Sequence, residues 1–326
     1  MRVLLWITGL LAVLYSGYWF VGQRAMQSGA EAFFANAARD GLVAENNGLT
    51  VNGFPSRFDL TVTDLHLADP RTGLDWRAPF VQVFALSYRP WHVITAFAPT
   101  QTFGTPDQTI TLTNDKLQAS LIVSPGGALA LDRTTLVGTG LRATSDANWV
   151  LAAEALRFAT RIDPSLANTH EIGVEITRMT PDPALSALMP TLPPVIELIQ
   201  LDAFATFSAP IDRFAPQTQP QLTALSVKEA GFTWGSLQAS ASGDLTVVNG
   251  MPEGRIALSV RGWRDLVPLA VTMGAIQPGV APTVTRVIEA LTTSSGDPEL
   301  VEIPLVFANG RMSLGLIPLG PAPRVN

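Results

Sequence analysis

The chain has 326 residues and a net charge of −6, with 47% hydrophobic and only 15% charged residues. Because no block of basic residues occurs in the sequence, binding to nucleic acid is not expected. The absence of cysteine excludes disulfides, thiolate catalysis and zinc–sulfur sites. The mean hydropathy of +0.26 is high for a soluble protein, so a membrane segment or a large apolar interior is expected.

The N-terminal segment carries the clearest functional signal. Residues 3–21 contain no charged side chain and would extend about 28 Å as a helix, which matches the bilayer core. Aromatic residues at 18–20 suit a membrane interface. We therefore predict an uncleaved anchor over residues 1–23, with a cleaved signal peptide as the alternative. The positive charges at Met1 and Arg2 favour an anchor in the bacterial inner membrane with the bulk of the chain in the periplasm.

The remaining chain divides into three predicted regions. Residues 24–46 are expected to form a membrane-proximal helix, with Gly41 as its stop. Residues 47–182 form a first β-rich half, and residues 183–326 form a second β-rich half that also contains helices. Each half places strands before helices, but no repeat of fixed period emerges. An internal duplication and one continuous domain therefore both remain open.

Short strands with one apolar face dominate both halves. Phe58, Leu60 and Val62 alternate with polar residues, and a hairpin with its turn at Asn114-Asp115 is predicted to repeat this pattern. The fold class predicted is mainly β with minor α, an extended curved antiparallel sheet or groove with a few helices. The residues predicted to form its apolar face are Phe58, Leu60, Val62, Ile110, Leu112, Leu117, Leu121, Val123, Ile256, Leu258 and Val260.

Two non-enzymatic functions are compatible with such a face. If the sheet forms an open groove, its apolar face is available to bind or transfer lipid or another apolar ligand. If the sheet closes into a sandwich or barrel, the same pattern gives a dry core. The protein would then be a periplasmic assembly or scaffold protein that binds a protein partner.

The sequence contains no recognisable catalytic constellation, so we expect no enzymatic activity and no cofactor. Asp64 and His66 can share one face of a strand, but with only Asp69 nearby they provide too few ligands for a metal site. An envelope hydrolase whose dispersed site gathers these three residues is the remaining enzymatic hypothesis.

Three stretches, "VNGFPSRFDL", "ALSYRPWHV" and "IPLVFANGRMSLGLIPLGPAP", together with the anchor, resemble a proteobacterial family of unknown function numbered twenty-one twenty-five. The resemblance covers nearly the whole chain and implies an envelope location without an activity. The residues that carry it are Gly53, Phe54, Pro55, Arg57, Pro90, Trp91, Asn309 and Gly310.

A more distant resemblance, at residues 243–270, is to AsmA-type proteins. It implies an inner-membrane anchor, a β-rich groove in the periplasm and a part in lipid homeostasis. The chain is shorter than the long AsmA-type proteins, which argues against a bridge across the periplasm.

Overall fold

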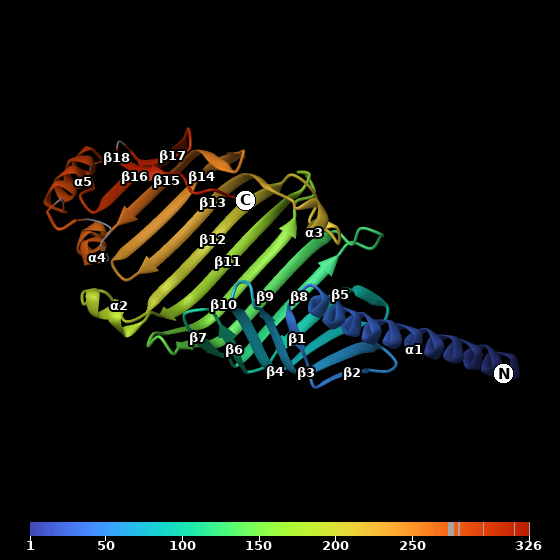
Figure 1. Ribbon diagram of the computed structural model, residues 1–326. Helices are drawn as coiled ribbons and strands as arrows, with labels where there is room; N and C mark the ends of the chain where they lie inside the picture. Colours follow the sequence, from blue (N-terminus) through green and yellow to red (C-terminus); the bar gives the residue numbers. More distant parts are fainter. Residues whose placement is uncertain (273–276, 280, 296, 316, 326) are drawn as a thin grey trace. The chain divides into compact units, whose positions relative to one another are not determined.

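The computed structural model describes residues 1–272, 277–279, 281–295, 297–315 and 317–325, and the fold is mainly β, as predicted (Figure 1). The chain forms two compact units. The first comprises residues 1–125 and 136–148, and the second comprises residues 126–135 and 149–326. We expected a division near residue 182, but the strands on either side of that position pair with each other, so it lies inside the second unit.

The N-terminal helix α1 runs without interruption over Arg2–Arg39, so the predicted anchor and the predicted membrane-proximal helix are one element. It ends two residues before Gly41, whose φ of +82° suits a glycine after a helix. Strand β1 (Val43–Glu45) follows directly, so the helix is shorter than predicted. By length and composition, α1 could cross a membrane, although signal sequences satisfy the same criterion.

The first unit contains strands that pair only antiparallel among its described residues. After β1 they are β2 (Gly48–Asn52), β3 (Arg57–Asp69), β4 (Leu74–Leu86), β5 (Arg89–Phe97), β6 (Thr100–Gly104), β7 (Thr109–Thr113), β8 (Lys116–Val123) and β9 (Leu131–Ser145), whose last ten residues belong to this unit.

The predicted hairpin at Asn114-Asp115 is wrong. Strand β7 pairs with β6 and β9, whereas β8 pairs with β5, so β7 and β8 are two segments of one interrupted strand. At the interruption, the buried Asn114 side chain donates hydrogen bonds from Nδ2 to the carbonyl oxygens of Ala98 (3.0 Å) and Pro99 (3.3 Å). Ala98 and Pro99 themselves separate β5 from β6, which both pair with β4.

These interruptions belong to a line of irregular positions across the first unit, which we call the crease. The link between β1 and β2 lies opposite Asp64 of β3, where φ is +49°, and Asp64 lies opposite Pro79 of β4. Beyond the β5–β6 and β7–β8 breaks, Gly140 in β9 has a φ of +58°. Proline lacks a donor and positive φ departs from strand geometry, so each of these residues breaks the regular ladder locally.

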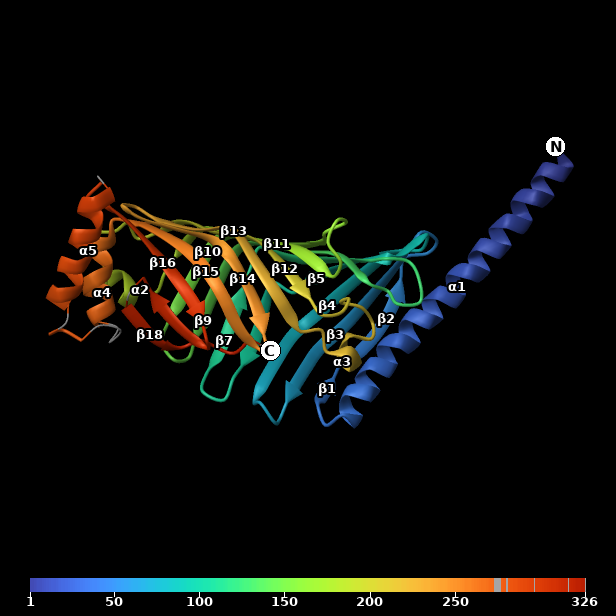
Figure 2. The ribbon, with the colours of Figure 1, turned by 90° about the horizontal axis from the view of Figure 1, so that it is seen from above.

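The core of the first unit lies between α1 and the face of β2 and β3. Trp19 of α1 is buried against Phe58, Leu60 and Val62, which are 5–7% exposed. The contact is close enough that a Cβ added at Gly22 would lie 2.4 Å from Cζ of Phe58. Figure 2 shows the N-terminal part of α1 extending beyond these strands.

The second unit is a meander in which each strand pairs antiparallel with the next. Its strands are β10 (Val150–Ile162), β11 (Thr169–Thr180), β12 (Ile196–Phe207), β13 (Leu222–Trp234), β14 (Leu237–Val248), β15 (Met251–Arg261), β16 (Leu300–Ala308), β17 (Arg311–Leu314) and β18 (Ile317–Pro321). The hairpin turns predicted at Asn249-Gly250 and Asn309-Gly310 are confirmed, since all four residues have positive φ, as a type I′ turn requires.

Short helices connect some strands of the second unit. They are α2 (Pro183–Leu188), α3 (Ala215–Thr218), a 3₁₀ turn at Trp263–Asp265, α4 (Leu266–Thr272) and α5 (Ala281–Ser295). The proline-rich segment after β11 forms only α2 and a turn, because β12 begins at Ile196. One buried cluster, around Trp234 and Leu237, lies beside α2, and another surrounds Ile256 and Phe307.

Candidate functional site

One face of the second unit is apolar across seven strands, and we call it the β10–β16 apolar face. The pairing register aligns its residues in four rows that begin at Leu156, Phe158, Thr160 and Ile162 of β10. The second row consists of Phe158, Val174, Leu201, Ala230, Ala241, Leu258 and Ile303. None of the four rows contains a charged residue, and their only polar side chains are Thr160 and His170.

Most of this face is neither sealed nor fully exposed. Every residue of the row that begins at Phe158 is half-buried. Buried apolar residues gather in two clusters at other parts of the sheet, one around Trp234 and one that includes Ile256 and Phe307 of the face itself. Trp234 and Leu237 of the cluster beside α2 are only 2–3% exposed, so the unit has a local buried core there. Among the described residues, the row that begins at Phe158 is therefore not enclosed, whereas parts of the neighbouring rows are buried.

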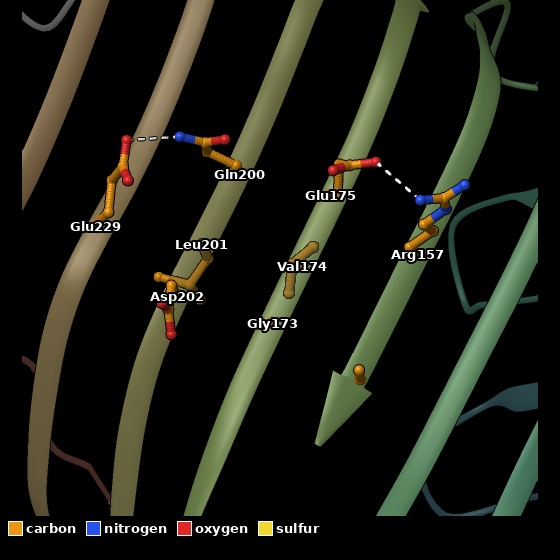
Figure 3. A pocket seen from close by; sticks show the side chains of 9 residues that line it. Arg157, Gly173, Val174, Glu175, Gln200, Leu201, Asp202 and Glu229 are labelled. Atoms are coloured by element: carbon orange, nitrogen blue, oxygen red, sulfur yellow. Dashed lines mark hydrogen bonds and ion pairs between the residues drawn. The ribbon is translucent and has the colours of Figure 1, made fainter. Parts of the chain in front are cut away.

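The opposite face of the same strands is polar. Figure 3 shows a shallow hollow of about 310 Å³ on it, where Arg157 pairs with Glu175 at 3.8 Å and Gln200 Nε2 donates to Glu229 Oε1 at 2.7 Å. These side chains project from adjacent strands and satisfy one another in cross-strand pairs. The arrangement suits a solvated face that stabilises the sheet.

The first unit contains an apolar pocket of about 390 Å³, which lies beside the C-terminal end of α1. Phe33 of α1, Leu67 of β3, Trp76 of β4 and Phe103 of β6 line it. The rings of Trp76 and Phe103 stack with centroids 6.2 Å apart, and Trp76 Nε1 donates to Gln101 Oε1 at 3.1 Å. Its volume and lining are those of a site for a small apolar group.

The residues predicted to form one apolar face fall into three groups. Phe58, Leu60 and Val62 lie beneath α1 and therefore contact protein. On β7 and β8, Ile110, Leu112 and Val123 are half-buried, Leu117 is buried and Leu121 is 41% exposed. Ile256, Leu258 and Val260 of β15 lie on the β10–β16 apolar face.

The predicted motif residues lie in turns and strand ends. Gly53, with a φ of +103°, accepts a backbone hydrogen bond from Arg57, and the peptide bond between Phe54 and Pro55 is cis. The Arg57 guanidinium pairs with Asp59 at 2.7 Å. Pro90 and Trp91 begin β5, and Asn309 and Gly310 form the turn described above.

Of the three residues of the hydrolase hypothesis, Asp64 and His66 line one shallow hollow, and Asp69 is not part of its lining. Asp64 accepts a hydrogen bond from Asn47, and Asp69 pairs with Arg71, whose hydrogen bonds lower the pKa of that carboxyl. His66 instead lies between two other acids, with Nε2 2.7 Å from Asp75 and Nδ1 3.1 Å from Glu45 (72% exposed). No group of metal ligands was found among the described residues.

The electrostatics around His66 indicate a structural pair. Burial opposes ionisation of Asp75, but hydrogen bonds from Arg77 and His66 outweigh it and lower the pKa of Asp75. A carboxylate held ionised in this way is a poor proton donor. The Asp75 carboxylate orients His66 and links β4 to β3 through their side chains.

Sequence reasoning missed most of the β10–β16 apolar face, including its one imidazole. His170 of β11 is 3% exposed and packs edge-on against Phe207, and its Nδ1 has no hydrogen-bond partner. Burial lowers the pKa of His170. The alternation of Ile172, Val174 and Ile176 was a visible signal, but only the pairing register reveals that it continues across seven strands.

Comparison with known proteins identifies the family alone. No curated protein and no solved structure matched the chain. The distant resemblance to AsmA-type proteins therefore stays a prediction. The match to a family covers residues 19–323 and begins at Trp19, a residue of α1 that is buried in the first unit. The chain belongs to the family described as uncharacterized protein conserved in bacteria, DUF2125.

Proposed function

We propose that this protein is a non-enzymatic protein of the bacterial envelope, anchored in the inner membrane by α1, whose periplasmic β-rich part binds the acyl chains of lipids on the β10–β16 apolar face. The observation that carries the proposal is the continuity of that face, which has no charged residue in four rows across seven strands.

The packing of α1 supports an anchor that is retained. Cleavage near residue 30 would remove Trp19 and Met26 from the core of the first unit and uncover Phe58, Leu60 and Val62. Exposing these side chains to water would cost roughly 1.5–3 kcal/mol each. A signal peptide does not form part of the folded core of its protein, whereas an anchor can.

The chemistry of the face favours hydrocarbon over a protein surface. Protein interfaces surround an apolar centre with polar groups that exchange hydrogen bonds. An acyl chain needs no hydrogen bond, and the face offers almost none. Seven strands at about 4.8 Å spacing span roughly 29 Å, about twice the thickness of one bilayer leaflet, so one row can accommodate an extended chain.

A photocrosslinking experiment tests the proposal. The full chain is reconstituted into vesicles that contain a phospholipid with a diazirine in its acyl chain, irradiated, and mapped by mass spectrometry. We expect crosslinks on α1 and on peptides of β10–β16.

Two neighbouring residues of β14 provide matched variants. Ala241→Asp introduces a charge between Ala230 and Leu258 on the apolar face, and Ser240→Asp introduces the same charge on the opposite face. The first should reduce crosslinking of β10–β16 at least tenfold, and the second should leave it unchanged. Labelling of α1 without labelling of the face would contradict lipid binding. A stoichiometric protein partner crosslinked there would instead favour a scaffold.

A further inference from the structure

We propose that two loops of the first unit lie in the membrane interface beside α1 and seat this unit on the bilayer. The loops are residues 53–56, between β2 and β3, and residues 87–88, between β4 and β5, which we call the seating loops. The proposal rests on the membrane anchoring proposed above and is independent of lipid binding by the second unit.

The seating loops are attached to α1 inside its apolar segment. Tyr15 Oη lies 2.9 Å from Ser87 Oγ, and the Tyr18 hydroxyl donates to the backbone carbonyl of Ser87. Trp19 Nε1 donates to the carbonyl of Arg57, immediately after the other loop, at 2.8 Å. The Trp19 ring also packs edge-on against Phe54 with centroids 5.3 Å apart. The loops are therefore fixed at the level of residues 15–19.

Helix geometry then places this level within the membrane. Residues 3–14, which precede the contacts, span only about 18 Å, whereas a bilayer core is about 30 Å thick. The apolar segment reaches that thickness only when it continues to Val21. Tyr15 is six residues before Val21, or about 9 Å along the axis. If α1 crosses the membrane, the seating loops reach the interface on its C-terminal side.

The composition of the loops suits that position. Phe54 is 55% exposed, Tyr88 is 61% exposed, and Phe20 of α1 is 59% exposed beside them. Arg89 follows Tyr88, and neither loop contains an acidic residue. Aromatic side chains and arginine are favoured at lipid headgroups, where their polar and apolar parts are both accommodated.

Ser87 and Ser56 also pair the two loops with each other through backbone groups. Ser87 is 0% exposed, its N–H donates to the carbonyl of Ser56 at 2.9 Å, and its hydroxyl reaches the same oxygen at 3.1 Å. Unpaired backbone groups are costly at membrane depth, so this mutual pairing lowers the cost of insertion. The exposed aromatic rings remain free to contact lipid.

Single-cysteine spin labelling tests the depth of the loops, because the natural chain has no cysteine. Phe54→Cys and Tyr88→Cys report on the seating loops. Leu10→Cys reports on the centre of α1, and Asp107→Cys is an exposed control at the other end of the strands, in the loop between β6 and β7. Each full-length variant is labelled with a nitroxide and reconstituted in vesicles of phosphatidylethanolamine and phosphatidylglycerol.

Collision rates with oxygen and with a water-soluble nickel chelate give the depth of each label. We expect the label at position 10 to lie in the bilayer core and the label at position 107 to lie in water. The labels at positions 54 and 88 should lie at the interface, where their accessibility to nickel is at least threefold lower than that of position 107. If 54 and 88 are as accessible to nickel as 107 while 10 is in the core, the seating proposal is wrong and the anchor stands. If 10 is also in water, the anchoring fails and the seating proposal fails with it.

Discussion

The two units differ in how far they bury the apolar faces of strands with alternating apolar and polar residues. In the first unit, α1 covers the apolar residues of β2 and β3, which become 5–7% exposed. In the second unit, short helices lie beside part of the sheet, and the row of the β10–β16 apolar face that begins at Phe158 remains half-buried. Alternation of apolar and polar residues therefore specifies that a strand has an apolar face, whereas a long helix packed on that face decides whether it becomes a core.

The largest expected effect compares two phenylalanines that differ mainly in this cover. Phe58→Ala should destabilise the first unit by about 3–5 kcal/mol, because it leaves a cavity beneath α1. Phe158→Ala, on the half-buried face, should cost roughly 1–2 kcal/mol, since less area returns to water. Denaturant unfolding of the full chain in detergent micelles measures both. Equal losses would show that the second face is as well covered as the first.

The contact between α1 and the sheet provides a second test of the cover. A valine at Gly22 would place its Cβ 2.4 Å from the Phe58 ring, so we expect Gly22→Val to destabilise the first unit by about 1–3 kcal/mol through overpacking. Gly29→Ala is the control, because nothing lies within 4 Å of its added Cβ. Alanine is also the better helix former, so this control should be neutral or slightly stabilising. A neutral Gly22→Val variant would argue against close packing of α1.

The prediction of Asn114-Asp115 as a hairpin turn explains where sequence reasoning fails. Two polar residues between segments of alternating apolar and polar residues form the same sequence pattern at a hairpin turn and at an interruption within one strand. Only pairing at long range, of β7 with β9 and of β5 with β8, distinguishes the two. At Asn249-Gly250 the glycine provides a stronger signal, because it readily adopts the positive φ of a tight turn.

The sequence predicted an apolar sheet face, but it did not predict which strands form that face. The alternation at Ile256, Leu258 and Val260 correctly located one strand of the β10–β16 apolar face. The same reasoning included Phe58, Leu60 and Val62, because the sequence does not say that α1 folds against them. The other strands of the face have many alanines and glycines, whose contribution emerges only when the register aligns them in rows.

The crease interrupts strands of the first unit, whereas the meander of the second unit contains only local register shifts, and Asn114 tests the importance of the crease. Asn114→Ala removes the side-chain donor to the carbonyls of Ala98 and Pro99 and leaves both with fewer partners in a buried setting. We expect a loss of about 1–2 kcal/mol, confined to the first unit. Hydrogen exchange of the β5–β8 amides should increase while that of β10–β16 stays constant. An unchanged exchange pattern would mean that Asn114 does not hold the crease.

The smallest expected effect concerns the single imidazole of the β10–β16 apolar face. Burial lowers the pKa of His170 in the folded chain, so between its folded and unfolded pKa values the unfolded chain binds more protons. The stability that comes from a neutral His170 is therefore complete above the unfolded pKa of about 6.5 and is lost as the pH falls through the lower, folded value. Asp132 works in the opposite direction and limits the shift.

His170→Gln removes this titration while retaining a polar side chain of similar reach. Melting temperatures measured from pH 7.5 to pH 5 should fall more steeply for the natural chain than for the variant, and the two curves should be most alike at pH 7.5. Because an acyl chain on the face would bury the imidazole further, bound lipid should steepen the slope of the natural chain alone. Parallel curves for the two proteins would show that His170 stays in contact with water, and the row it occupies would then be too wet to hold hydrocarbon.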